Sequence, residues 1–160
     1  MIFMPTFSIE SNGLLEKTAV YYNGQQIGGI REIYLFLSED GTFDSIIQYQ
    51  GTDKNIHTKN IFLETLSKVK VSEPSFTDEE ARELRLLTIE SDGNIETTNV
   101  YIDDNLEGGI VMLLVHIKAM VGGNGIKSIF SRKPVPELVE FRAEITYRND
   151  DETIETETIF

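Results

Sequence analysis

The sequence contains no cysteine, which excludes disulfide bonds, zinc–thiolate sites and thiol nucleophiles together. Its only histidines are His57 and His116, so metal or acid–base chemistry would depend on these two side chains and on carboxylates. The two histidines lie at non-equivalent positions of the repeat described below, and neither stands next to a serine or a second histidine. We therefore expect no cofactor, no metal, no catalytic residue and no enzymatic activity.

Basic residues are few. The chain has 14 Lys and Arg against 27 Asp and Glu, which gives a formal net charge of −13. Proteins bind nucleic acid non-specifically by neutralising phosphates with Lys and Arg, so this balance argues against a nucleic-acid partner. The charge is compatible with simple solubility or with attraction to a basic protein partner.

Long apolar runs are also missing. The first residues, MIFMPTFSIES, hold no basic segment and no apolar stretch of signal-peptide length, and no other stretch approaches a membrane span. We expect a cytoplasmic or virion-associated protein that does not bind a membrane.

The sequence does contain an internal repeat. Residues 9–38 align with residues 89–118 at a constant offset of 80, and residues 43–62 align with residues 141–160 at an offset of 98. Shared features include Ile-Glu-Ser, Val-Tyr and Gly-Gly-Ile in the same order. Such self-similarity indicates two copies of one supersecondary unit.

Each copy has the pattern of an antiparallel β-meander. Asn12-Gly13 and Asp92-Gly93 are typical of tight hairpin turns, and Asn23-Gly24 and Asp40-Gly41 mark later turns of the first copy. We predict an all-β protein of two tandem meanders, packed as a pseudo-twofold sandwich or barrel. The predicted parts are repeat 1 (7–62), a linker (63–86) with one short helix near 78–84, and repeat 2 (87–160), with the repeats packed as one unit.

The third predicted strand of each copy has one continuous apolar face, formed by Ile33, Leu35 and Leu37 and by Leu113, Val115 and Ile117. In the second copy the opposite face is also apolar, with Met112 and Leu114 beside His116. Some element must cover this second face, and we expect the linker helix, which the capping-box pattern from Thr77 to Glu80 predicts, to do so. Lys68 to Val71 predicts a short edge strand.

The largest difference between the copies is an insertion. Four residues (39–42) join the third and fourth strands of repeat 1, whereas twenty-two (119–140) join those of repeat 2. The segment from Gly108 to Pro136 contains no Asp or Glu. Its pattern predicts a hairpin arm that turns at Asn124-Gly125 and ends at Pro134 and Pro136. The arm either embraces a neighbouring acidic subunit or folds over its own core.

This arm and the adjacent strand are the best candidates for a functional surface, because long irregular additions to a regular scaffold often carry function. The candidate interaction residues are Met112, Leu114, His116, Lys118, Met120, Lys127, Ile129, Arg132 and Lys133. A second candidate is a site between the repeats at Tyr21 and Tyr101, which recur at equivalent positions.

Other motifs favour structural interpretations. Gly28-Gly29 and Gly108-Gly109 could form an anion-binding nest, but acidic neighbours favour a bulge or turn. The Gly122–Ser128 run lacks the context of a phosphate-binding loop, and Asp150–Glu152 lacks the spacing of a calcium loop.

The segment TAVYYNGQQIGGIREIYLFLSEDG, residues 18–41, resembles small β-domains of phage and prophage accessory proteins, and residues 98–118 resemble them less closely. The resemblance implies a structural or interaction role and transfers no catalytic residue. We expect a non-catalytic module that self-associates or binds a protein through the arm. The alternatives are an acidic inhibitor or immunity-type protein that blocks a basic partner, and a small-ligand carrier or enzyme with a site between the repeats lined by Tyr21, Tyr101 and His116.

Overall fold

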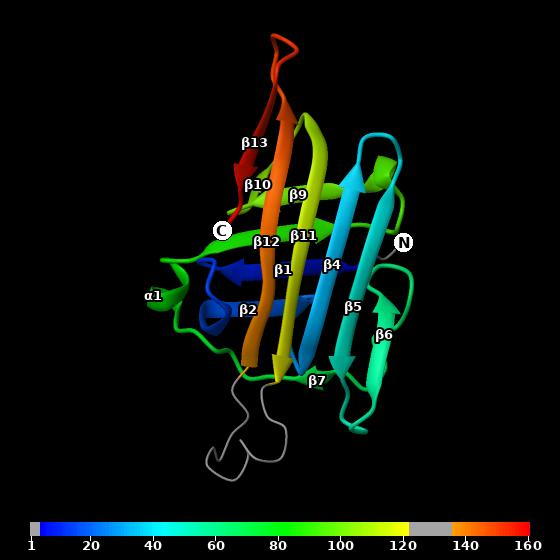
Figure 1. Ribbon diagram of the computed structural model, residues 1–160, viewed down its shortest axis with the longest axis vertical. Coiled ribbons are helices and arrows are strands. Elements are labelled where there is room, and N and C mark those ends of the chain that lie inside the picture. Colours follow the sequence, from blue (N-terminus) through cyan, green and yellow to red (C-terminus); the bar gives the residue numbers. More distant parts are fainter. Residues whose placement is uncertain (1–3, 122–135) are drawn as a thin grey trace.

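The computed structural model describes residues 4–121 and 136–160. It is an all-β protein, as the sequence predicts, with two antiparallel sheets and a single α-helix among the described residues. Sheet A has the order β10-β9-β8-β1-β2-β3-β7, and sheet B has the order β13-β12-β11-β4-β5-β6. The strands of one sheet cross those of the other steeply, so the molecule is an orthogonally packed sandwich (Figure 1).

The strands are short in sheet A and longer in sheet B. Sheet A contains β1 (Thr6–Ser11), β2 (Thr18–Tyr22), β3 (Gln25–Gly28), β7 (Lys70–Val71), β8 (Arg85–Glu90), β9 (Asn99–Ile102) and β10 (Asn105–Leu106). Sheet B contains β4 (Ile30–Ser38), β5 (Phe43–Gln50), β6 (Ile56–Asn60), β11 (Ile110–Val121), β12 (Pro136–Arg148) and β13 (Ile154–Thr158). Short 3-10 turns at Leu15–Lys17 and Ile95–Thr97 precede β2 and β9.

The core lies between the sheets and draws on both halves of the chain. Alternation along β4 and β11 directs one side chain in two inward, and the predicted inner faces, including Leu35 and Val115, are buried. From sheet A, β1 and β8 contribute a matching apolar layer that includes Ile9 and Ile89, both fully buried. One hydrophobic cluster therefore joins residues of the two predicted repeats.

At the centre of each sheet, a strand of the first half pairs with its counterpart from the second half. Ser8 of β1 lies opposite Thr88 of β8, and their hydroxyl oxygens are 2.9 Å apart. Leu35 of β4 likewise lies opposite Val115 of β11. In both pairs the partners are 80 positions apart in sequence, which is the offset of the repeat. An ancestral duplication as the origin of this correspondence stays a prediction.

The connections between strands differ in part from the predicted turns. Asn23 and Gly24 both have positive φ (52° and 82°), as a two-residue hairpin turn requires. The expectation for Asn12-Gly13 and Asp92-Gly93 is wrong in detail, because six residues join β1 to β2 and eight join β8 to β9, and in each pair only the glycine has positive φ. The following 3-10 turn takes up the extra length. Gly29 also has positive φ (75°), where the chain passes from sheet A into sheet B.

Helix α1 (Asp78–Ala81) begins at the predicted capping box, where Thr77 and Glu80 exchange side-chain-to-backbone hydrogen bonds. It is shorter than the predicted 78–84, and none of its residues is buried. The expectation that it covers the outer face of the third strand is wrong. The helix lies at the side of the sandwich (Figure 1), with Glu80 near Lys17. Its short acidic sequence offers no apolar face to a sheet.

The boundary of β12 also differs from the prediction. We expected this strand to begin at Phe141, but it begins at Pro136 and pairs there with Val121 of β11. Proline lacks a backbone N–H, and the first position of a strand tolerates that loss. The predicted turn at 124–125 and return strand at 126–130 lie outside the described residues. Within the described residues, no helix is long and apolar enough to cross a membrane.

Candidate functional site

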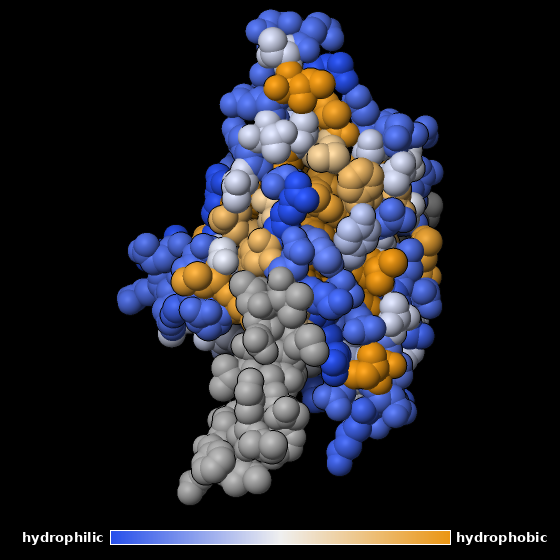
Figure 2. Space-filling view, in the orientation of Figure 1, coloured by the Kyte–Doolittle hydropathy of each residue, from blue (hydrophilic) through white to orange (hydrophobic). Residues whose placement is uncertain are grey.

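The outer face of sheet B has an apolar centre with charged neighbours. Tyr34 and Phe36 of β4 lie beside His116 and Leu114 of β11, and Ile46 of β5, which is 41% exposed, continues the strip. We call these residues, together with Met112, the sheet B strip. No element among the described residues covers it (Figure 1). Figure 2 views this face and shows hydrophobic side chains among hydrophilic ones.

His116 is held by contacts on several sides. Its Nε2 atom lies 2.7 Å from Oε2 of Glu32 on β4, and its Nδ1 atom lies 4.0 Å from Oε2 of Glu140 on β12. The ring of Tyr34 meets the imidazole edge-on, with the centroids 5.5 Å apart. These contacts fix the orientation of the imidazole within the sheet B strip.

Four of the predicted interaction residues lie together on this outer face. Met112, Leu114, His116 and Lys118 follow one another at alternate positions of β11, as the strand pattern predicts. Met120 belongs to the same strand. The remaining predicted residues, Lys127, Ile129, Arg132 and Lys133, lie outside the described residues. The predicted arm is therefore not part of the site that we describe.

Tyr21 and Tyr101, the predicted site between the repeats, are not in contact with each other. They stand in one cross-strand row on the outer face of sheet A, where Ser8 and Thr88 separate them. His116 lies on the opposite outer face of the sandwich, so these three side chains line no common cavity. Burial, a 2.8 Å hydrogen bond from the Tyr21 hydroxyl to Glu10, and the charge of Glu10 raise the pKa of Tyr21 to about 12.

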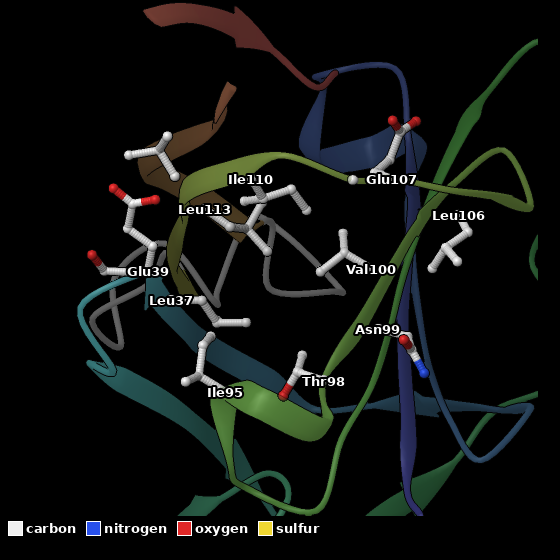
Figure 3. Close-up of a pocket in the computed structure, with 13 residues that line it drawn as sticks. Leu37, Glu39, Ile95, Thr98, Asn99, Val100, Leu106, Glu107, Ile110 and Leu113 are labelled. Carbon is white, nitrogen blue, oxygen red and sulfur yellow. The ribbon is translucent and has the colours of Figure 1, made fainter. Parts of the chain in front are cut away.

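A pocket of about 430 Å³ opens between the two sheets at the β9–β10 end. Leu37, Ile110 and Leu113 form its sheet B side and Val100 faces them from sheet A (Figure 3). Glu39 and Glu107 lie at opposite sides of the hollow. We call this pocket the larger cleft. Its size and its apolar walls with polar edges are those of a binding site.

Charged contacts surround the larger cleft. Glu39 accepts a hydrogen bond of 2.5 Å from the guanidinium of Arg148. Burial, followed by the nearby charges of Glu107 and Glu157, raises the pKa of Tyr147 to about 12. Glu39, Glu107 and Glu157 therefore stand together with Arg148 and Arg85 at this end of the sandwich.

A smaller cleft of about 260 Å³ lies at the β2–β3 end. Most of its lining residues occupy positions 80 away from those of the larger cleft, for example Leu15 and Ile95, Val20 and Val100, and Ile30 and Ile110. Ser72, which follows β7, lines only the smaller cleft. The two clefts are thus counterparts in the two halves of the fold, and they differ in what covers them.

Sequence reasoning missed both clefts. The repeat alignment does place Ile95, Val100 and Ile110 at positions equivalent to Leu15, Val20 and Ile30. A cleft, however, forms only where the sheets diverge and no segment fills the gap. Whether a segment fills the gap depends on the pairing of β3 with β7, which the repeat alignment does not predict.

No family model, no curated protein and no solved structure matches this chain. In residues 4–121 and 136–160, no group of three or more His, Asp or Glu side chains is placed to hold a metal ion.

Proposed function

We propose that this protein is a non-catalytic interaction module that binds another protein through the outer face of sheet B, in the cytoplasm or on a virion. The observation that carries the proposal is the sheet B strip, a run of apolar and aromatic side chains on β4, β5 and β11 that no element among the described residues covers. Except for the exposed Ile46, the side chains of the strip are half-buried, and a partly exposed apolar strip with a polar surround is typical of protein-binding surfaces.

The composition of the face supports the same role. Aromatic residues and methionine are enriched at the centres of protein interfaces, and the strip contains Tyr34, Phe36 and Met112. Around it stand charged residues of both signs, among them Glu32, Asp44, Lys118 and Arg142. Charged rims of this kind set the orientation and rate of association more than its affinity.

The charge of the whole chain favours a basic partner. At a net charge of −13, two copies of the chain repel each other at long range, whereas a basic protein is attracted. Self-association, the other form of the predicted interaction, would require the strip to overcome that repulsion.

Site-specific photo-cross-linking tests this proposal. A photoreactive phenylalanine analogue at Tyr34 places the probe in the sheet B strip, and the same analogue at Tyr21 is the matched control on the outer face of sheet A. In an extract of the source cells we expect a discrete cross-linked product from position 34 and none from position 21. Equal products from both positions, or none from position 34, would contradict the proposal.

The acidic-inhibitor alternative has its own supporting observation. All five residues of β13 are exposed at an edge of sheet B, and they include Glu155 and Glu157. The adjoining turn adds Asp150, Asp151 and Glu152. Such a one-sign edge suits a basic partner surface. If the inhibitor function is correct, replacing Glu155 and Glu157 with glutamine weakens capture of the partner at low salt, while the Tyr34 probe yields no product.

A further inference from the structure

The two halves of the fold differ at the outer edges of sheet A. In the first half, β3 pairs with β2 so that Val20 lies opposite Ile27 and Tyr21 opposite Gln26. In the second half, β10 pairs with β9 in the equivalent register, with Tyr101 opposite Leu106, and the Glu107 N–H donates to the Val100 carbonyl at 2.9 Å. The two hairpins therefore present equivalent outer edges.

Only the first of these edges has a partner strand in the part of the chain that the structure describes. β7 pairs antiparallel with β3, with Val71 opposite Ile27 and Lys70 opposite Gly28. The Ser72 N–H then donates to the Gln26 carbonyl at 2.9 Å. Within residues 4–121 and 136–160, β10 ends sheet A with no strand on its outer side.

The glycines that follow these edge positions show the same difference in space. A Cβ built on Gly28 would lie 2.6 Å from the Ser72 Oγ atom, because the β7 segment passes directly over this glycine. A Cβ built on the equivalent Gly108 meets nothing within 4 Å. Among the described residues, the space that β7 fills in the first half is open in the second, beside the larger cleft.

The open edge is also more acidic than the paired one. Glu107 stands where the first half has Ile27, and Asp103 and Asp104 stand where it has Asn23 and Gly24. In the larger cleft, Glu39 lies at the position equivalent to Ala119 of the smaller cleft. Val111 lies at the position equivalent to Arg31, so the neutral side chain replaces a cation. Asp103 is paired with Arg85 and Glu39 with Arg148, so the added negative charge that would attract a cationic ligand comes chiefly from Asp104 and Glu107.

We propose that the β10 edge binds a basic, extended segment of a partner protein, which adds antiparallel to sheet A as β7 does at β3. Backbone hydrogen bonds to an edge strand give such binding its affinity, and pockets for alternate side chains give its specificity. The segment passes over Gly108 and places a cation opposite Glu107, at the position that Val71 takes opposite Ile27 in the first half. This surface is separate from the sheet B strip.

The chain itself provides a probe of the right chemistry. Residues 67–72, Ser-Lys-Val-Lys-Val-Ser, alternate basic and apolar side chains and include β7. The experiment titrates this peptide, with acetylated and amidated ends, into the isotope-labelled full-length chain and follows backbone amide shifts by NMR. We expect saturable shifts centred on Leu106 to Gly108 and on the cleft residues Ile95 and Ile110.

Two variants and one control peptide make the test specific. Gly108→Val should keep the fold, because Gly108 has no positive φ and its Cβ direction is open, yet it should abolish the shifts by occupying the path of the added strand. Glu107→Gln should weaken binding about threefold, as expected for one exposed ion pair, while Asp44→Asn on the outer face of sheet B should not. The charge-reversed peptide Ser-Glu-Val-Glu-Val-Ser should give no saturable shift.

Several results would overturn the proposal. These are the absence of saturable shifts with the basic peptide, equal binding of the charge-reversed peptide, and undiminished binding to a folded Gly108→Val variant. Shifts confined to Gln26 to Gly28 would mean that the peptide only exchanges with β7. Dimerisation of the free chain through β10 would assign this edge to a second copy.

Discussion

Three of the residue differences between the two clefts change the charge. Ile27, Arg31 and Ala119 around the smaller cleft correspond to Glu107, Val111 and Glu39 around the larger one. None of them changes the backbone path, because the hairpins keep the same register. The differences instead change the sign of the local charge, which is how two similar scaffolds acquire different ligands.

At high pH, four tyrosines should titrate late, because burial raises the pKa values of Tyr21, Tyr22, Tyr49 and Tyr147. The pKa values of Tyr21 and Tyr147 are raised to about 12, chiefly by burial, whereas an unfolded tyrosine ionises near its ordinary value of 10.0. The folded state holds these protons more tightly, so this contribution to stability is complete below the unfolded pKa and is lost as the pH rises through the folded pKa.

The measurement is a spectrophotometric tyrosinate titration of the folded chain, which has six tyrosines. Tyr21→Phe should remove one late-titrating group and reduce the loss of stability between about pH 10 and 12. An unchanged number of late-titrating groups in this variant would show that the Glu10 contact does not hold the Tyr21 proton.

At the scale of elements, the two halves can be compared directly at the two-residue turns that join β2 to β3 and β9 to β10. Asn23-Gly24 and Asp103-Asp104 occupy the same turn, and all four residues have positive φ. Glycine adopts that conformation without steric cost, whereas aspartate adopts it at some cost. The second half therefore carries strain that the first avoids.

Exchanging the turn residues should change stability in opposite directions. Asp104→Gly should raise the free energy of unfolding and Gly24→Asp should lower it, each by about 0.5 to 1 kcal/mol. Urea denaturation of the two variants and the parent chain measures both changes. If the two substitutions shift the unfolding midpoint in the same direction, backbone strain is not the governing term.

Elements with strong apolar alternation were predictable from the sequence, and weakly patterned ones were not. The inner faces of β4 and β11 follow directly from their alternating residues, and the capping box at Thr77 gave the start of α1. β3 and β10 were missed because they are short and rich in Gln and Asn, so that hydrogen bonding to a neighbour, and not apolar pattern, defines them.

The same reasoning explains what was missed of the candidate site. Met112, Leu114, His116 and Lys118 were found because one strand places alternate side chains on one face. The larger cleft and the open β10 edge were not found, because they arise from contacts between segments far apart in sequence. The role of the 119–140 insertion stays a prediction.

At the scale of the whole molecule, each sheet is centred on one strand from each half of the chain. β1 pairs with β8 and β4 pairs with β11, so neither half contains a complete sheet by itself. Both the sheet B strip and the unequal clefts follow from this arrangement. The strip spans β4 and β11, and the clefts lie at the two ends of the shared core.

The fold therefore depends on the register of β1 and β8, in which Ser8 lies opposite Thr88. Because the chain has no cysteine, the double variant Ser8→Cys with Thr88→Cys contains only the two introduced thiols. Directly opposed side chains in antiparallel strands lie close to disulfide geometry. The control pair, Ser8→Cys with Glu90→Cys, is offset by two residues on the same face, since Glu90 lies opposite Thr6.

The decisive measurement is the yield of intramolecular disulfide in these two variants under mild oxidation, read by mass spectrometry of the non-reduced, digested protein. We expect a link between positions 8 and 88 in nearly all molecules and little between 8 and 90. Equal yields in the two variants, or a higher yield for the control pair, would contradict it.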